Sequence, residues 1–446
     1  MISKDRKTGI DKEKTKDGKS PFETSLKLNL FYDVRDRGVF EKTESYGKSL
    51  GLRQRRQRNA MRMLLCNLFY SRGDKIRVYR AKRSLGSERY NPLNIGYRSV
   101  ISSLDALIKD GLIIYELGYK DLSTGEGRVS TMVVSDKLRG WFEAVGWDYQ
   151  TAELLPEEVV VVRNQSQTKD IIDYVDGPHS IWLRERLKEY NNLLNECDIV
   201  VVGKDDLIQA EYSDHCLKRK FVSYEMHDSY EGDLLAFGGR MYGPWCNLNP
   251  YQRANIEIDG ERTIEVDLEA SHINVLYRLI TGKPYQGGDP YKLIVDRVIV
   301  PRHIVKQMAT IMQFTGSIQA TTATLENHYR EKDIPDTRPT KEIERSKEYV
   351  NLKLRVRPSE VIEAYLDKHS KVAYYYLRGK QFGHNIQQIE SSFVFEVVQQ
   401  LTSANIPVLT VYDSFIVQER HKEHLMHIIN TTQPVNRNMM TIEDVV

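Results

Sequence analysis

The stretch RHIVKQMATIMQFTGS, residues 302–317, carries the most specific pattern in this chain. Arg302 and Lys306 are four residues apart, so on a helix they lie on one face, about one turn from each other. Phe314 and Gly316 follow eight and ten residues after the lysine. A basic pair at this spacing also occurs on the solvated face of many amphipathic helices, so its meaning depends on the segments around it.

Two aspartates, one before and one after this stretch, are predicted at the ends of strands. Asp267 ends a β-rich run from Thr263 and precedes residues with helical apolar spacing, and Asp413 lies in the middle of the apolar segment TVYDSFIV, residues 410–417. A carboxylate at a strand end is held rigidly at the sheet edge, as a metal-binding acid requires. Taken singly, Asp267 could instead cap a helix, and Asp413 could be an ordinary turn residue.

The order of these segments resembles the single-subunit nucleic-acid polymerases, which include the family A DNA polymerases and the phage-type RNA polymerases. The resemblance covers about residues 235–420 and rests on FGGRMYGPWCNLNP (237–250), TIEVDLEASHINVLYRL (263–279), GDPYKLI (288–294), RHIVKQMATIMQFTGS (302–317) and TVYDSFIV (410–417). It implies an α+β fold with a right-hand polymerase palm and fingers over 235–446, and a charged, helical insertion over about 318–380.

The resemblance also implies roles for individual residues. Asp267 and Asp413 would bind two Mg²⁺ ions, and with Lys306 they would form the catalytic set. The substrate-binding residues would be Arg302, Lys306, Phe314, Gly316, His272 and Tyr412, and the residues that contact nucleic acid in this part of the chain would be Arg240, His384 and Gln388. His272 and His384 could instead be solvated or satisfied within the core.

Departures from the family pattern leave the choice of sugar open. Ser414 and the absence of an exonuclease domain favour RNA or primer synthesis. His272 stands where family A DNA polymerases carry Glu, Phe314 lacks a hydroxyl, and the spacing from Arg240 to Asp267 is short, all of which favour DNA. We predict a template-directed nucleotidyltransferase that makes RNA or primers. The alternatives are a family A type DNA-directed DNA polymerase and a catalytically degenerate DNA-binding regulator or replication initiator.

Residues 1–50 are predicted to be a basic, largely disordered segment, with folded structure beginning near Leu26. Residues 51–147 then show helices followed by a two-stranded hairpin, which resembles a winged helix-turn-helix domain. Between residues 51 and 120 there are 15 Lys and Arg against 5 Asp and Glu, a net charge of +10, which favours a polyanionic partner. The expected DNA contacts are Arg53, Arg55, Arg56 and Arg98, with Arg58, Ser99 and Ser102 beside them; protein binding is the alternative use of such a domain.

Residues 148–234 are predicted to be a connector and a helical, thumb-like region, for which an ordinary helical hairpin is the alternative. The four cysteines form no Cys-x-x-Cys pair, which argues against a zinc site or a disulfide framework and fits a reducing cytoplasm, in a bacterial or phage-infected cell. No apolar run is long enough to cross a membrane, and the charged amino terminus is not that of a secretion signal. The expected partners are therefore DNA, nucleoside triphosphates and an RNA product, with no membrane.

Overall fold

The computed structural model describes residues 26–78, 88–120, 127–165, 171–203, 208–211, 216–224, 235–329 and 340–433. The chain has the predicted α+β character and divides into two compact units. The first unit comprises the described residues up to Glu158 together with 171–173, and the second comprises 159–165 and the described residues from Tyr174 onward. None of the helices in the described ranges has the length and apolar character needed to cross a bilayer.

The first unit packs helices on a four-stranded sheet with the strand order β1-β3-β7-β4. Its elements are β1 (Leu26–Lys27), β2 (Tyr32–Val34), α1 (Arg37–Ser49), α2 (Arg55–Tyr70), β3 (Ile76–Val78), α3 (Tyr97–Lys109), β4 (Ile113–Glu116), β5 (Tyr119–Lys120), β6 (Gly127–Arg128), β7 (Ser130–Val134), α4 (Asp136–Val145), β8 (Ala152–Leu154) and β10 (Ile171–Ile172). The predicted helix and hairpin are confirmed as α3 and as the pairs β4–β7 and β5–β6.

Folded structure begins at Leu26, as predicted, so the division that assigns residues 1–50 to a largely disordered segment is wrong for residues 26–50, which contain β1, β2 and α1. Residues 26–50 fold against α2 because they supply charged partners as well as apolar contacts. Arg62 of α2 is only 4% exposed, and its guanidinium donates to Asp33, at 2.7 Å, and to Glu44. A buried guanidinium is costly without partners, so α2 requires the acids that the preceding segment supplies. Residues 1–25 lie outside the described part of the chain.

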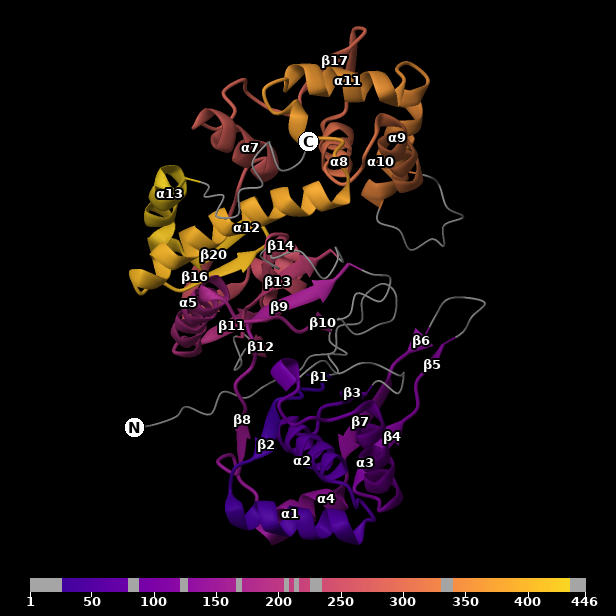
Figure 1. Ribbon diagram of the computed structural model, residues 1–446, viewed down its shortest axis with the longest axis vertical. Helices are drawn as coiled ribbons and strands as arrows, with labels where there is room; N and C mark the ends of the chain where they lie inside the picture. The colour runs from indigo at the N-terminus through magenta and orange to yellow at the C-terminus, as the bar shows by residue number, and fades with distance from the viewer. Residues whose placement is uncertain are drawn as a thin grey trace. The chain divides into compact units, whose positions relative to one another are not determined.

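The second unit is built on a six-stranded sheet with the order β12-β11-β15-β16-β20-β19 (Figure 1). Its strands are β11 (Ile199–Val202), β12 (Ile208–Glu211), β15 (Ile256–Ile258), β16 (Glu261–Asp267), β19 (Val408–Val411) and β20 (Ser414–Gln418). Three further strands pair beside it, with β13 (Lys218–Ser223) between β9 (Val160–Asn164) and β14 (Gly238–Tyr242).

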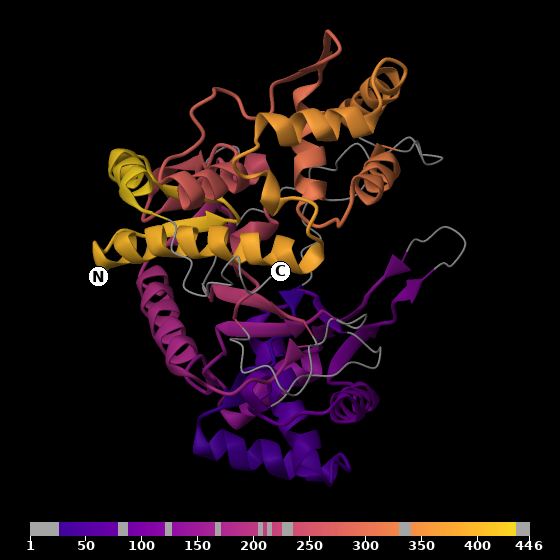
Figure 2. The same cartoon turned by 45° about the horizontal axis from the view of Figure 1, so that its top comes forward.

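The long helix α12 (Lys380–Ser403) organises the second unit. It contacts α5 (Pro178–Asn195), α7 (Ser271–Thr281), α13 (Lys422–Thr431) and β14. Figure 2 shows its whole length, with α8 (Arg302–Met312), α9 (Ile318–Tyr329), α10 (Thr340–Lys353) and α11 (Pro358–Lys368) gathered near its amino-terminal end. These helices share one core with the hairpin β17 (Leu293–Val295) and β18 (Val298–Val300), and α9, α10 and α11 confirm that the described part of residues 318–380 is helical.

The region predicted to be a connector and a helical, thumb-like segment is helical in one element only, among its described residues. The helix at 179–197 is present as α5, and its Leu183, Leu187, Tyr190 and Leu194 are buried. Strands β11, β12 and β13 come after it, and they pair within the same sheets as the strands of the predicted palm. Runs of β-branched residues such as Val200–Val202 favour strands, and they overrode the helical expectation here.

Candidate active site

The two predicted metal-binding aspartates lie side by side at one end of the large sheet. β16 pairs with β20 in antiparallel register, so that Asp267 is directly opposite Ser414, and the Leu268 amide donates to the Asp413 carbonyl at 3.2 Å. Two non-glycine residues near them adopt positive φ angles, Ala270 at +47° and Tyr412 at +59°. Such backbone is strained, and strain of this kind gathers at functional sites.

The electrostatics of this pair favour a bound cation. Packing removes part of the solvation of Asp267, although the residue as a whole is exposed, and this raises the pKa of its carboxyl group. The negative charge of Asp413 raises that pKa further, and the positive charge of Lys306 opposes the shift. Two like charges brought together in this way are stabilised by a positive ion between them or by nearby cations.

A third acid in the region, Glu265, is already neutralised. Its carboxylate accepts from Arg253 Nε at 2.9 Å and from the Ser414 hydroxyl at 2.7 Å. The described residues contain no group of three or more His, Cys, Asp or Glu placed to hold a metal. Mg²⁺ in nucleotide sites is nevertheless bound by one or two carboxylates together with waters and phosphate oxygens, so the chemistry of Asp267 and Asp413 fits this ion.

Helix α8 presents the predicted phosphate-binding residues on an exposed face. Lys306 is exposed and makes no ion pair with any described residue, which leaves its ammonium available to an anion. Arg302 is exposed too; its Nε donates to Asp289 at 2.8 Å, and its guanidinium lies 5.2 Å from the centre of the Tyr291 ring. The predicted helix ends at Met312 rather than Ser317, so Phe314 and Gly316 lie in the turn after it.

The GDPYKLI segment that orients Arg302 is held by the end of α11. Lys368 donates to the carbonyl oxygens of Asp289 and Lys292, at 2.9 and 2.7 Å. The His369 ring is buried, which lowers its pKa and keeps it neutral, so its Nε2 donates to the Pro290 carbonyl while its Nδ1 accepts from the Tyr277 hydroxyl. The helical insertion therefore positions part of the site.

Phe314 packs against the first turn of α12. A β-carbon on Gly383 would lie 2.6 Å from the Phe314 ring, so the glycine permits this close approach. His384 lies edge-on to Phe314, with ring centres 5.4 Å apart, and its Nδ1 is hydrogen-bonded to the Tyr224 hydroxyl. Burial lowers the pKa of His384 to about 4, so it is neutral near pH 7. His384 thus supports the aromatic ring and does not offer a charge to nucleic acid.

Arg240, predicted to contact nucleic acid, is fixed by β14 and α12. Its Nη2 donates to Glu390 at 2.9 Å, and its guanidinium lies 5.5 Å from the centre of the Tyr412 ring. Gln388, predicted to contact nucleic acid, is only 2% exposed and donates to the Ser392 hydroxyl, so it faces the protein interior. Its neighbour Gln387 faces Arg240, and in the amide orientation that satisfies both groups its oxygen accepts from Arg240 Nε at 2.9 Å.

His272 is not a free ring at the edge of the site. Its Nδ1 lies 2.5 Å from a carboxylate oxygen of Glu390, which also accepts from the Ser271 hydroxyl. Burial alone would raise the pKa of Glu390, but His272, Arg240 and Ser271 more than offset it and lower that pKa to about 2. Glu390 is therefore ionised throughout the physiological range.

In the first unit, four of the predicted basic residues are exposed and a fifth is engaged by the protein itself. Arg53, Arg55 and Arg56 are exposed at the start of α2, and Arg98 is exposed at the start of α3. Arg58 instead donates to Glu44 at 2.5 Å and to the carbonyl oxygens of Leu52 and Arg53. Ser99, expected to be exposed beside Arg98, is buried.

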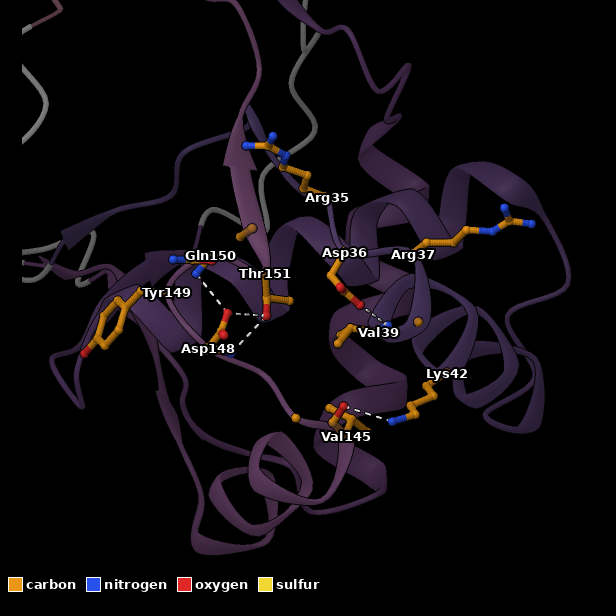
Figure 3. Close-up of a pocket in the computed structure, with 13 residues that line it drawn as sticks. Arg35, Asp36, Arg37, Val39, Lys42, Val145, Asp148, Tyr149, Gln150 and Thr151 are labelled. Atoms are coloured by element: carbon orange, nitrogen blue, oxygen red, sulfur yellow. Dashed lines mark hydrogen bonds between the residues drawn. The ribbon is translucent and has the colours of Figure 1, made fainter.

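The first unit also has a pocket beside the start of α1 (Figure 3). Several polar groups that line it are already hydrogen-bonded within the first unit. Asp36 accepts from the Val39 amide at 2.8 Å, Lys42 donates to the Val145 carbonyl at 3.0 Å, and Asp148 accepts from the Thr151 hydroxyl at 2.9 Å. No residue predicted to bind nucleotide or DNA lines this pocket.

Comparison of the chain with protein-family models, with curated proteins and with solved structures found no match. The polymerase resemblance therefore stays an expectation drawn from the sequence motifs.

The sequence pattern did not indicate Glu390, Gln387, Asp289 and Tyr291 as parts of the site. The signal for Glu390 was present, because it is an acid within the apolar run of α12 and a charged residue is rarely buried without a partner. The other three stand beside residues of the recognised motifs, but nothing local shows which side chain each contacts.

Proposed function

We propose that the chain is a template-directed nucleotidyltransferase that uses Mg²⁺, with its active site at Asp267 and Asp413. The observation that carries this proposal is the pairing of these two carboxylates across β16 and β20 beside the exposed Lys306. The proposal is supported further by Lys306, whose positive charge acts on Asp267, and by Arg302, which shares the exposed face of α8 with Lys306.

In this proposal Asp267 and Asp413 hold the Mg²⁺ ions, which when bound activate the attacking 3′-hydroxyl and neutralise charge on the phosphates. Lys306 and Arg302 bind the triphosphate, and Lys306 is placed to give a proton to the departing pyrophosphate. Phe314 packs beneath the new base pair, with Gly316 leaving open space at the turn. Arg240, fixed by Glu390, faces the nucleic-acid backbone.

We further propose that the first unit is a winged helix-turn-helix domain that binds DNA. The order α2, β3, α3, β4 and β7, with a hairpin after α3, supports this proposal. So do the four exposed arginines at the starts of α2 and α3. The partners would be template DNA, nucleoside triphosphates and an RNA product.

The test is nucleotide addition to a primed or unprimed template, with Mg²⁺ and either set of triphosphates. Asp267→Asn and Asp413→Asn should each lower the rate by at least about a hundredfold, because the charge that holds the cations is lost. Asp259→Asn is the matched control: Asp259 lies in the neighbouring turn of the same sheet, and its Oδ1 accepts from the Asp198 amide.

The outcome can refute the proposal. Wild-type protein that binds DNA but adds neither type of nucleotide would be a degenerate, regulatory palm. Variants of Asp267 or Asp413 that keep more than about a tenth of the activity would place the reaction elsewhere.

A further inference from the structure

Glu390 is a buried charge whose partners all come from the region of the candidate active site. Its side chain is 1% exposed and lies in the middle of α12. Its donors are Arg240 of β14, at 2.9 Å, and His272 and Ser271 in the first turn of α7. An apolar side chain would fill such a place without the desolvation cost of a charge, so the acid calls for a role other than stability.

One face of α12 supports three predicted nucleotide-site residues at successive turns. Gly383 packs against Phe314, Gln387 bonds to Arg240, and Glu390 bonds to both Arg240 and His272. Positions separated by three, four and seven residues lie on the same face of a helix. α12 therefore fixes these side chains relative to one another.

The contact with Glu390 defines the state and the direction of the His272 ring. An ionised carboxylate only accepts hydrogen bonds, so Nδ1 of His272 must carry a hydrogen. The other ring nitrogen, Nε2, has no hydrogen-bond partner within the described ranges of the chain. A ring held at Nδ1 in this way presents Nε2 to whatever lies beyond it.

The contacts of Glu390 also connect the ring to the aspartate pair. Arg240, the other partner of Glu390, lies 5.5 Å from the centre of the Tyr412 ring, and Tyr412 immediately precedes Asp413. His272 follows Asp267 by five residues and lies in the first turn of α7. His272 is therefore tied to both strand ends that carry the aspartates.

We propose that Glu390 is a positioning residue that fixes His272 as the hydrogen-bond partner of a ribose 2′-hydroxyl, so that the substrates are ribonucleoside triphosphates. The inference rests on the proposed function. A hydroxyl both donates and accepts, so it pairs with Nε2 whether or not that nitrogen carries a proton. A deoxyribose has no such group and leaves Nε2 without a partner.

Glutamine does not reproduce these contacts. The carboxylate accepts on both oxygens, from Arg240 on one and from His272 and Ser271 on the other. A glutamine amide accepts on one side only, and with its oxygen toward the Arg240 guanidinium it would present its NH₂ group to Nδ1 of His272. The ring must then either leave this contact or move its hydrogen from Nδ1 to Nε2, and in both cases it loses the charge-assisted bond that fixes its direction.

The experiment compares kcat/KM for ATP and dATP in the wild type, His272→Ala, Glu390→Gln and the double variant. We expect the wild type to prefer ATP, and each single variant to lower the ATP to dATP ratio by about tenfold or more. The double variant should show no further loss, because both changes remove the same contact. Glu396→Gln, the same chemical change on α12 at a position off the 383–387–390 stripe, should leave the ratio unchanged.

Each contrary result has a distinct meaning. A wild type that prefers dATP, or an unchanged ratio in His272→Ala, overturns the sugar assignment while leaving the polymerase proposal standing. Effects that multiply in the double variant would show that Glu390 does not act through His272. If Glu390→Gln fails to fold, the ratio in His272→Ala still decides the assignment. If the wild type adds neither nucleotide, the proposed function itself fails, and this inference fails with it.

Discussion

Replacing Gly239 with alanine tests the packing that places Arg240. Gly239 has a φ angle of +77°, in the left-handed region, and a β-carbon there would lie 2.8 Å from Phe221, 2.9 Å from Arg219 and 2.9 Å from the Ser391 hydroxyl. Real β-carbons do not approach other atoms this closely, so the buried side chains of Phe221, Arg219 and Ser391, or the backbone that carries them, must shift to admit the methyl group.

The expected loss has two parts. The left-handed backbone costs an alanine about 1–2 kcal/mol. Inserting a methyl group into filled space adds about 1–3 kcal/mol. The free energy of unfolding of the second unit should therefore fall by about 2–5 kcal/mol, which at about 2 °C per kcal/mol for a unit of this size lowers its Tm by about 4–10 °C.

Gly260→Ala separates the two parts. Gly260 lies in the turn between β15 and β16 with a φ angle of +74°, and a β-carbon there would meet no atom within 4 Å. It bears the backbone cost alone, so its Tm should fall by only about 2–4 °C. Scanning calorimetry of the full chain measures both shifts. Equal shifts in the two variants would refute the close packing of β14 on α12, whereas a larger shift in Gly239→Ala should be accompanied by reduced nucleotide addition.

Charged residues carry two further predictions. Replacing Arg53, Arg55 and Arg56 with alanine should lower the slope of log binding constant against log salt concentration for double-stranded DNA by about 3, because each lost phosphate contact releases about one counterion fewer. Arg37→Ala, the control, should change this slope little. An unchanged slope in the triple variant would indicate a protein partner. Glu390 has a pKa of about 2 in the folded protein against an ordinary value of 4.5. Its ionised form therefore contributes about 3 kcal/mol of stability above pH 4.5 that is lost as the pH falls toward 2, and urea unfolding across that range should show a smaller loss in Glu390→Gln than in the wild type.

The strands and the helix around the aspartates were predictable because they follow from the spacing of apolar residues that are neighbours in the sequence. The apolar residues on either side of Asp413 mark two buried strands and the turn between them, and β19 and β20 have those bounds almost to the residue. The helix after Asp267 likewise follows from apolar spacing, and α7 begins at Ser271. Periods of two and of three to four residues are properties of neighbouring positions, so no knowledge of the fold is needed to read them.

The ion-pair partner of each charged residue was not predictable, because that partner lies far along the chain. Arg58 looks like one member of a basic run, but it is neutralised by Glu44, within the segment expected to be disordered. Glu390 is 119 residues from Ser271 and 150 from Arg240. The acidic partners of the buried Arg62 are separated from it in the same way, since Asp33 and Glu44 precede it by 29 and 18 residues.

The proposed site and its proposed specificity differ in the same way. The residues proposed to bind metal ions and phosphates come from strand ends and one helix face, whose positions follow from local pattern. The proposed choice of sugar depends on what holds His272, and that is a carboxylate on a helix that the motif pattern assigns no part in the sugar site. A histidine bonded to an ionised acid has a hydrogen-bonding nitrogen of fixed direction, whereas the same ring without that acid can rotate. Under our proposal the acid at position 390 therefore makes His272 a partner of the 2′-hydroxyl, and without that acid the ring would limit the sugar site mainly by its bulk.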